Sequence, residues 1–360
     1  MTDRFRVAIA GIGAVARIHA RSIVDIEHAQ VVAGSCRTES KGREFADTFD
    51  CEWYADTEAM LEAVDPDVLD ICTPSGTHLD VVASAAERGI DALCEKPLEI
   101  TTERIDRMAS AADAGGIELG AIFHQRYNPV IRTLHDAAAG GRFGDLSTVN
   151  AYVPWWREDE YYAPDRWQGT EQFDGGGALM NQSIHGVDAI GWLAGATMNL
   201  PPEENPVEEV FAYTANRAHG DRIEVEDCAV AVLRYRNGAL GQVLGSTSMY
   251  PGSLKRVQIG GRGGTAEILE DELSVWRFHD DREEDAEIRA EFGESTEIGG
   301  GAADPMAIDY ANHRRNIAAF LDSLSAGEPF ALDVREARKA VEIIEAIYES
   351  AERNEPVGLD

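Results

Sequence analysis

Short apolar runs alternate with segments of helical periodicity over the first third of the chain. The apolar runs lie at 5–10, 31–36, 68–73, 91–95 and 118–123, and the helical patterns lie between them at 14–27, 40–48, 57–64, 77–88 and 101–115. Several of the runs are continuously apolar, which is typical of strands covered by helices on both faces. The pattern therefore predicts βαβ units and a doubly wound parallel sheet in residues 1–123.

The alternation of strand and helix patterns ends after residue 123. Strand patterns follow at 146–156, 207–216, 227–236, 239–249, 254–260, 264–269 and 273–279, and helical patterns close the chain near 305–326 and 333–353. A run of strands after a βαβ half predicts a second, α+β domain in residues 124–360, with a large and mainly antiparallel sheet. We expect the C-terminal helix to pack back on the first domain.

Charge narrows the range of partners. The formal net charge is −33, and only four lysines stand among the 32 basic residues. Such a charge repels nucleic acids and anionic membranes, so neither is expected as a partner. A distributed acidic surface with little lysine also suits a protein from a halophile, because concentrated salt screens the self-repulsion. The alternative is an ordinary acidic enzyme.

The remaining composition predicts a cytoplasmic protein without a metal site. No window of 18 apolar residues could span a membrane, and the N-terminus enters a strand pattern at once, without room for a secretion signal. The five cysteines are scattered and form no Cys-x-x-Cys pair. This spacing argues against a zinc site or a disulfide framework and for a reducing compartment.

A glycine motif follows the first predicted strand. Gly11-Ile12-Gly13-Ala14-Val15-Ala16 is G-x-G-x-x-A between a strand and a helix, the context that a Rossmann dinucleotide site requires. Gly11 permits the tight turn, Gly13 lets the backbone approach a pyrophosphate, and Ala16 lets helix and strand pack closely. We expect residues 11–15 to bind the cofactor; the alternative is a glycine turn without a ligand.

The end of the second strand bears on which cofactor is used. An NAD site usually offers an acidic residue there for the ribose 2′-hydroxyl, whereas a nearby arginine accommodates a 2′-phosphate. This chain has Ser35 and Arg37 at that point, and the first acid, Glu39, comes late. The residues favour NADP(H) over NAD(H). Two alternatives remain: Arg37 stacks on the adenine, or Glu39 takes the acidic role.

Three further motifs make the chain resemble the Gfo/Idh/MocA (glucose–fructose oxidoreductase/inositol dehydrogenase) family. They are Cys72-Thr73-Pro74-Ser75-Gly76-Thr77-His78, Cys94-Glu95-Lys96-Pro97, and the stretch from Gly175-Gly176-Gly177 through Asn181 and His185 to Asp188. Arg126-Tyr127-Asn128-Pro129 also fits. The resemblance implies a Rossmann domain joined to an open-faced α/β domain, and hydride transfer at a carbon of a sugar or polyol. It further implies homodimers or homotetramers that associate through the exposed sheet.

The resemblance also implies site residues. Those expected at the cofactor, beside the glycine motif, are Thr73, Pro74, Ser75, His78, Glu95 and Lys96. Lys96 is expected to be catalytic, because a lysine at a strand end can donate to a substrate hydroxyl and stabilise alkoxide character; the alternative is a surface lysine. His185 titrates near neutrality and can carry the hydroxyl proton, with Asp188 one turn on to orient it. The alternative for His185 is a structural pair with Asp188.

Asn181 departs from the pattern of many family dehydrogenases, which carry aspartate four residues before the histidine. An amide cannot act as a base, so Asn181 can only position substrate. Asn181, His185, Asp188 and Trp192 are spaced to share one helical face. The residues expected to bind substrate are Asn181, Asp188, Arg126, Trp156, Arg166 and Trp167, with His124 and Gln125 as further candidates. The aromatic stretch 155–167 could instead serve core packing or an interface, and His19 is assigned a structural role.

The leading hypothesis is therefore an NAD(P)-dependent dehydrogenase of a sugar, polyol or sugar derivative. One alternative keeps the fold but hydrolyses glycosides through transient oxidation. The other is a non-catalytic NAD(P)-binding regulator, which would need the glycine motif but neither Lys96 nor His185.

Overall fold

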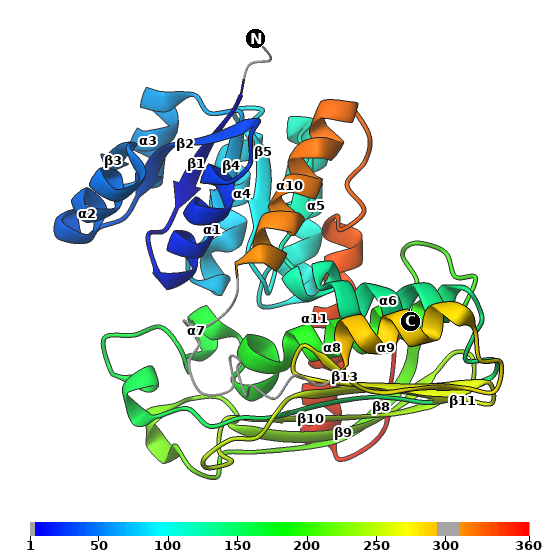
Figure 1. Ribbon diagram of the computed structural model, residues 1–360. Helices are drawn as coiled ribbons and strands as arrows, with labels where there is room; N and C mark the ends of the chain where they lie inside the picture. The colour runs from blue at the N-terminus through cyan, green and yellow to red at the C-terminus, as the bar shows by residue number, and fades with distance from the viewer. Residues whose placement is uncertain (1–3, 294–309, 360) are drawn as a thin grey trace. The chain divides into compact units, whose positions relative to one another are not determined.

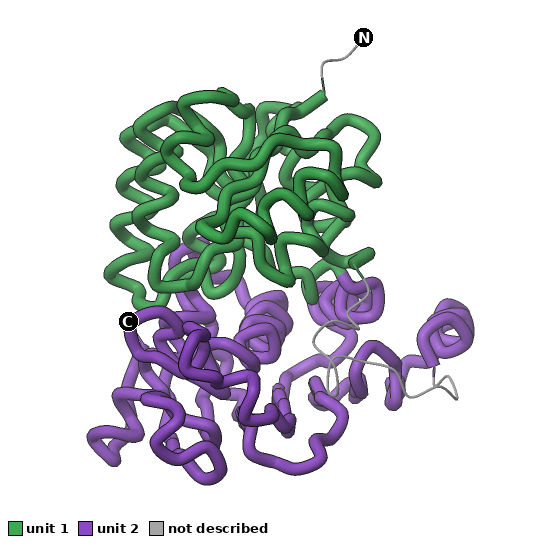
Figure 2. Tube along the Cα trace, turned by 90° about the vertical axis from the view of Figure 1, so that its left-hand side faces the viewer, with its two compact units in different colours: residues 1–127, 309–338 green, residues 128–308, 339–360 purple. Residues whose placement is uncertain are grey.

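The computed structural model describes residues 4–293 and 310–359. The chain divides into two compact units, drawn in different colours in Figure 2. The first unit comprises residues 1–127 and 309–338, and the second comprises residues 128–308 and 339–360.

The first unit holds a six-stranded parallel sheet in the order β3-β2-β1-β4-β5-β6. Its strands are β1 (Phe5–Ala10), β2 (Ala29–Ser35), β3 (Glu52–Tyr54), β4 (Val68–Ile71), β5 (Asp91–Cys94) and β6 (Leu119–Ala121). The intervening helices are α1 (Ala14–Val24), α2 (Glu39–Phe49), α3 (Thr57–Val64), α4 (His78–Ala86) and α5 (Thr102–Gly115). Figure 1 shows these helices packed around the sheet, and the predicted doubly wound parallel fold is confirmed.

Local signals place the ends of several helices. Asp56 precedes α3, and its carboxylate accepts a hydrogen bond from the backbone N–H of Ala59 at 2.8 Å. Thr101 caps α5 in the same way, and Gly116 ends that helix in the left-handed conformation. These are the side chains that satisfy free helix-end groups most readily. β3 was not expected, because three residues are too few to show a period.

The first unit is completed by a segment far along the chain. Helix α10 (Ala311–Ala326) contacts α1, and the Asn316 side chain bonds to the backbone N–H of Phe123 and the carbonyl oxygen of Ala121. Phe320 and Phe330 pack over Gly120, where a Cβ would lie 2.7 Å from the Phe320 ring. The described residues 310–338 thus belong with the first sheet, although they follow most of the second unit in the chain. The part of the expected 305–326 helix before 310 lies outside the described residues.

The second unit is built on an eight-stranded sheet in the order β13-β12-β11-β7-β10-β9-β8-β14. Its strands are β7 (Leu146–Pro154), β8 (Val207–Ala215), β9 (Cys228–Tyr235), β10 (Leu240–Ser246), β11 (Arg256–Gly261), β12 (Gly264–Leu269), β13 (Glu272–Phe278) and β14 (Val357–Gly358). Among the described strand pairs of this second sheet, only β7–β10 is parallel, so the predicted mainly antiparallel sheet is confirmed.

Helices lie along one side of this sheet, as Figure 1 shows. They are α6 (Pro129–Ala139), α7 (Glu171–Asp174), the π-helix Ala178–Ser183, α8 (Ile184–Gly195), α9 (Glu283–Phe292) and the later part of α11 (Val334–Arg353). On β9 every second residue is buried and the alternate residues Val230, Val232 and Arg234 are exposed, as in a sheet covered on one side only. None of the described helices is long and apolar enough to cross a bilayer.

Candidate functional site

The glycine turn of the first unit connects β1 to α1. Gly11 has a φ of +89°, and a Cβ on it would lie 2.8 Å from the carbonyl oxygen of Cys72, so only glycine fits. No atom lies within 4 Å of the position that a Cβ on Gly13 would take. α1 begins directly after Gly13 without a side-chain cap, which leaves its first N–H groups available to an anion. The turn therefore fits the pyrophosphate of a dinucleotide.

The end of β2 presents one exposed cation. Ser35 is buried, and its hydroxyl shares a hydrogen bond of 2.9 Å with Thr57. Arg37 is exposed, and its guanidinium has no ion pair within the described residues. The Glu39 carboxylate is also exposed, but Arg43 binds it at 2.8 Å. The guanidinium at this strand end is thus available to a ligand, whereas the nearest carboxylate is already paired.

The strand order brings β1, β4 and β5 side by side, so their carboxyl ends share one edge of the sheet. Lys96 follows β5 there and is half-buried, with its backbone N–H bonded to a Glu95 carboxylate oxygen at 3.0 Å. Thr73 and Pro74, which follow β4, are half-buried, and Ser75 is buried. This is the edge at which open α/β sheets bind their ligands.

The His78 side chain is bonded to backbone groups of two loops. Its ring is buried, with Nδ1 3.1 Å from the carbonyl oxygens of Pro97 and Leu98 and Nε2 2.9 Å from that of Thr73. Both ring nitrogens are therefore used by backbone groups. His78 ties the loop after β4 to the loop after β5, and so supports the cofactor edge without offering a nitrogen to it.

A buried charged chain lies behind the Glu95-Lys96 turn. His19 in α1 has Nδ1 2.9 Å from Asp70 and Nε2 3.0 Å from Glu95, and all three side chains are buried. Burial alone would lower the pKa of His19, but the Asp70 carboxylate holds it well above its usual value. Burial would raise the pKa of Glu95, yet the hydrogen bond and charge of His19 lower it to about 2. His19 is thus a cation shared by two carboxylates.

His313 of α10 completes this cluster. Its ring stacks on His124 with 4.1 Å between centroids, and its Nε2 lies 4.0 Å from Glu95. Burial and the neighbouring His19 cation lower its pKa to about 3, so it is neutral. His19, Glu95 and His313 lie close enough to hold a metal ion. The separations around His19 are those of hydrogen bonds, however, and both of its nitrogens are already engaged.

Arg126 forms an ion pair within the first unit. Its guanidinium is buried and donates to the Glu336 carboxylate at 2.8 Å, in the first turn of α11. This ion pair holds two segments of the first unit together, and the role of Arg126 as a substrate ligand stays a prediction. Gln125 lies beside His124, with 3.4 Å between their side-chain nitrogens.

In the second unit, Asn181 and His185 belong to different kinds of helix. Asn181 lies in the π-helix, and His185 lies in the first turn of α8. Glu226 anchors the start of the π-helix by accepting hydrogen bonds from the backbone N–H groups of Gly177 and Leu179, at 2.9 and 2.7 Å. Asn181 therefore lies before the regular α-helix, which carries His185, Asp188 and Trp192. Trp192 stacks on His135 of α6, with 3.8 Å between ring centroids.

The Asn181 side chain belongs to a polar network that the sequence did not reveal. Its Nδ2 donates to the buried Asp174 at 2.6 Å, and its Oδ1 accepts from Gln182 at 2.7 Å. Asp174, seven residues earlier, is therefore a carboxylate that contacts the Asn181 side chain. His185 is half-buried, and Asp188 is 3% exposed.

The aromatic side chains of residues 155–167 make two separate groups of contacts. Trp155 and Arg157 lie together, with the Arg157 guanidinium 4.9 Å from the Trp155 ring centroid. Trp156 instead has its ring 5.6 Å from both His219 and Tyr250. Arg166 is exposed and Trp167 is half-buried. The side chains of this stretch that bond to Gln182 in the Asn181 network are those of Arg157 and Tyr161, and the carbonyl oxygen of Trp156 accepts from Arg157.

The first unit combines a parallel doubly wound sheet, a glycine turn that leads into an uncapped helix, and a lysine on the same sheet edge. These features define a dinucleotide-binding oxidoreductase with a separate second domain. The chain belongs to the Gfo/Idh/MocA oxidoreductase family. The model of the family's NAD-binding Rossmann fold matches residues 5–121, and that of its C-terminal alpha/beta domain matches residues 137–359.

Similar proteins come from several organisms. The rhizopine catabolism protein MocA of Rhizobium meliloti is 28% identical over 264 residues, which are 73% of this chain and 78% of that protein. D-xylose 1-dehydrogenase (NADP(+)) 2 of Haloferax volcanii is 26% identical over 360 residues, 98% of each chain. The structure of the WlbA dehydrogenase from Bordetella pertussis, in complex with NADH and UDP-GlcNAcA, has a TM-score of 0.88 at 28% identity and covers 99% of this chain and 98% of that chain.

Proposed function

We propose that this protein oxidises or reduces a CH–OH carbon of a sugar, polyol or sugar derivative with a nicotinamide cofactor. The observation that carries the proposal is the shared edge of β1, β4 and β5, where a glycine turn fitted to a pyrophosphate and Lys96 occur together. The names of the relatives support the substrate class, since they include a xylose dehydrogenase and a myo-inositol dehydrogenase.

Lys96 and His185 are assigned complementary roles in this reaction. A bound nicotinamide accepts or returns the hydride. The Lys96 ammonium donates to the reacting oxygen and stabilises the negative charge that develops on it. His185 takes the hydroxyl proton in oxidation and returns it in reduction, with Asp188 as its orienting partner. Asn181 positions a substrate hydroxyl, and Trp156, Arg166 and Trp167 remain candidate substrate contacts.

The experiment that tests these roles compares Lys96→Ala and His185→Ala with the wild-type enzyme on a panel of sugars. Both variants are expected to lose turnover by about two to four orders of magnitude, the range for removal of a proton-transfer or charge-stabilising group, while NADPH still binds. Near-normal kcat in both variants would show that the roles are wrong. Turnover of aryl glycosides without net change in NAD(P)H would instead favour a glycoside hydrolase.

The cofactor is assigned as NADP(H) rather than NAD(H). Two observations support this assignment. The Arg37 guanidinium is exposed, and the nearest carboxylate, that of Glu39, is already in an ion pair with Arg43. Arg37→Ser is expected to weaken NADPH binding at least tenfold and to leave NADH binding unchanged, because only the 2′-phosphate offers a charge to this side chain.

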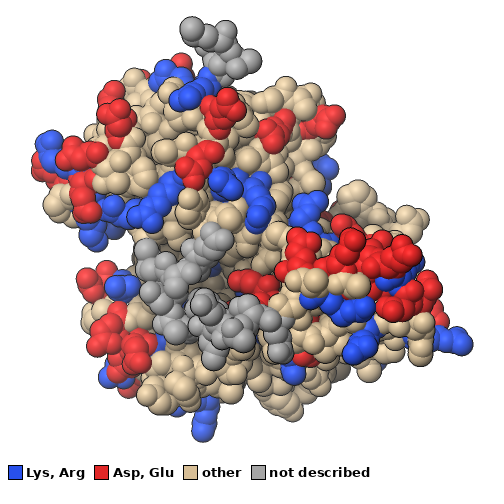
Figure 3. Space-filling model, viewed as in Figure 1, with Lys and Arg blue, Asp and Glu red and all other residues tan. Residues whose placement is uncertain are grey.

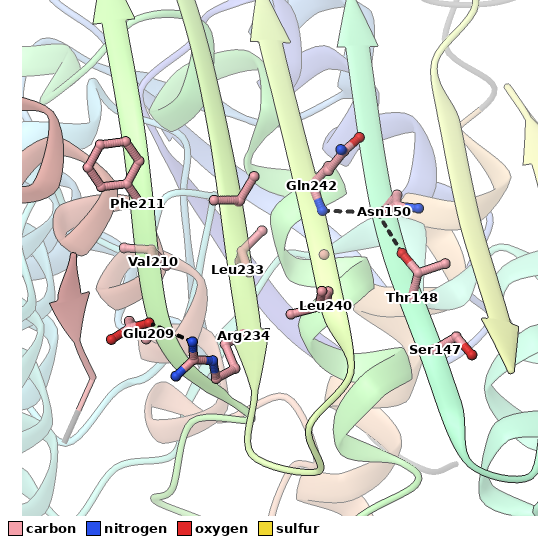
Figure 4. Close-up of a pocket in the computed structure, with 12 residues that line it drawn as sticks. Ser147, Thr148, Asn150, Glu209, Val210, Phe211, Leu233, Arg234, Leu240 and Gln242 are labelled. Atoms are coloured by element: carbon pink, nitrogen blue, oxygen red, sulfur yellow. Dashed lines mark hydrogen bonds and ion pairs between the residues drawn. The ribbon is translucent and has the colours of Figure 1, made fainter. Parts of the chain in front are cut away.

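The open face of the second sheet is assigned to contact with further copies of the chain, as a homodimer or homotetramer. Figure 4 shows the strands of this face, with the Glu209–Arg234 ion pair and the Asn150–Gln242 hydrogen bond on it. The exposed apolar side chains there are Tyr213, Val230, Val232 and Leu240, and Leu240 is 59% exposed. An apolar group of this kind on a sheet face is typical of an interface between proteins.

The protein is further proposed to work in the concentrated salt of a halophile's cytoplasm. Figure 3 shows acidic side chains spread over the face in view, densest over α9. The net charge of −33, the four lysines and a full-length relative in Haloferax volcanii agree with this assignment. Stability that rises steadily up to molar KCl would support it, since salt relieves the self-repulsion.

A further inference from the structure

Glu226 satisfies three consecutive backbone donors at the start of the π-helix Ala178–Ser183. Its carboxylate accepts from the N–H groups of Gly177 and Leu179, at 2.9 and 2.7 Å. Its main-chain carbonyl oxygen accepts from the N–H group of Ala178 at 3.0 Å. The first N–H groups of a helix have no partner within the helix, and a capping side chain usually satisfies one of them. Here three of these groups converge on a single residue.

Tyr348, in α11, completes this arrangement. Its hydroxyl donates to a Glu226 carboxylate oxygen at 3.0 Å, and the backbone N–H of Met180 bonds to the same hydroxyl. Burial raises the pKa of Tyr348 well above its usual value, so the hydroxyl stays neutral and remains a donor. Burial also raises the pKa of Glu226, and the N–H groups of Leu179 and Gly177 oppose that rise because they favour the carboxylate form.

The glycine run before the π-helix is explained by the same two residues. A Cβ on Gly176 would overlap the Tyr348 hydroxyl, and a Cβ on Gly177 would overlap the main-chain carbonyl oxygen of Glu226. Both positions therefore require glycine. The run lies at the point where Glu226, just before β9, and Tyr348 make their closest approach to the backbone of the helix start.

The helix that these residues hold carries groups assigned to the reaction. Asn181 lies within the π-helix, and the chain continues directly into α8, whose first turn carries His185. Reacting groups must be held within about 0.5 Å of their productive geometry, by neighbours that are themselves fixed. We propose that Glu226 is a positioning residue of the proposed reaction, because it fixes the turn that places Asn181 and His185. This rests on the proposed function, whose own test is hydride transfer.

Two substitutions of Glu226 separate its geometry from its charge. Glu226→Gln keeps the size of the side chain, but its amide NH2 must face the N–H of either Gly177 or Leu179 in place of an acceptor oxygen. Glu226→Asp keeps the charge but is one methylene shorter, so its carboxylate cannot hold both N–H groups in the same place. Both variants are expected to lower kcat by about 10- to 100-fold, since a displacement of about 1 Å of reacting groups has an effect of this order.

The kinetic test uses NADP+ and, separately, NAD+ with D-xylose, D-glucose and myo-inositol, in molar KCl. The enzyme concentration is taken from titration with NADPH, so that only protein with a folded first unit is counted. In both variants the KM of the sugar is expected to change by less than about threefold, because the lost alignment acts on the transition state. NADPH binding is expected to stay unchanged.

Two further variants calibrate the effect. Tyr348→Phe removes one hydrogen bond to the carboxylate, and it is expected to lower kcat by about 2- to 10-fold. Glu224→Gln is the matched control, because Glu224 is an exposed glutamate whose carboxylate also accepts a backbone N–H, that of Glu171 at 2.9 Å. It is expected to keep kcat within about twofold of the wild-type value, as surface substitutions usually do.

Hydrogen exchange followed by mass spectrometry gives a second measurement that requires no substrate. Residues 177–183 should exchange at least about tenfold faster in Glu226→Gln than in the wild-type protein, because a backbone N–H loses its acceptor. The strand β12 should exchange at the same rate in both proteins.

Two results would overturn the inference. A kcat within twofold of the wild-type value in Glu226→Asp would show that only the charge is needed. Unchanged exchange of residues 177–183 in Glu226→Gln would show that this residue does not hold the helix start. A wild-type protein that transfers no hydride to any of the sugars would instead overturn the proposed function, and the exchange measurement alone would then decide whether Glu226 fixes the turn.

Discussion

Replacing His19 with glutamine tests the buried chain that supports the Glu95-Lys96 turn. His19 bonds to Asp70 and to Glu95 at 2.9 and 3.0 Å, and both carboxylates are buried. Glutamine can donate to one of them but carries no charge, so Asp70 and Glu95 lose the cation that they share. Removing one partner of a buried ion pair costs about 3–5 kcal/mol, and we expect a loss of this size at pH 7.

The pH dependence of the loss has a definite sign. The pKa of Glu95 is lowered to about 2, so its contribution to stability is present above its ordinary value of 4.5 and is lost as the pH falls toward 2. The pKa of His19 is raised, so its contribution is complete below 6.5 and is lost as the pH rises through the raised value. In the variant, burial raises the pKa of Glu95 without the opposing charge of His19, so this carboxylate takes up a proton more readily as the pH falls. The cost of His19→Gln is therefore expected to be smaller at pH 5 than at pH 7.

Hydrogen exchange followed by mass spectrometry is a suitable assay, because it reports on β1 and α1 separately from the second unit. His28→Gln is the matched control, since His28 pairs with Asp322 at the surface and its loss should cost about 0–1 kcal/mol. Adding Asp70→Asn to His19→Gln should restore part of the stability by removing one uncompensated charge. A cost equal to that of the control, or no recovery in the double variant, would refute the reasoning.

Three further predictions concern other parts of the molecule. Gly13→Ala should weaken NADPH binding at least tenfold without lowering the melting temperature, because no protein atom lies near the added Cβ. Gly11→Ala should lower the melting temperature, because Gly11 has a φ of +89° and an added Cβ would contact Cys72. Equal melting temperatures for the two variants would contradict this. As the pH falls from 6.5 to 4, the first unit should lose up to about 1.4 kcal/mol of stability per pH unit. The reason is that the pKa of His313 is lowered to about 3, so the unfolded chain binds a proton in this range and the folded chain does not. In His313→Gln, the stability measured by hydrogen exchange should change less steeply with pH. Val232→Glu should shift the mass measured by light scattering toward the monomer, since Val232 is 48% exposed on the open sheet face, and an unchanged mass would exclude that face as the interface.

Much of the fold could be predicted from periodicity alone. The first strand, the helix after residue 57 and the hairpin at Asn237-Gly238 are all encoded locally, by apolar runs and by turn residues. The short β3 could not be predicted, because three residues show no period. The place of α10 beside β6 depends on Asn316 meeting backbone groups at 121 and 123, almost two hundred residues away.

The site was predicted less completely, for a similar reason. The glycine turn and Lys96 stand in local motifs, and the structure places both at one sheet edge. The pairing of Arg126 with Glu336, and that of Asn181 with Asp174, depend on tertiary contacts that one sequence does not display. The sequence did contain a signal for the buried pair of Asp70, because a carboxylate within the buried run Val68–Ile71 requires a partner. That partner is His19.

The measurement that tests the central claim most directly is a fluorescence titration of the purified protein, in molar KCl, with NADPH and separately with NADH. Saturable binding of both cofactors is expected, with NADPH binding clearly tighter. Tighter binding of NADH would keep the enzyme class and overturn the role of Arg37. No binding of either, by folded protein shown to be free of co-purified cofactor, would contradict the dehydrogenase itself.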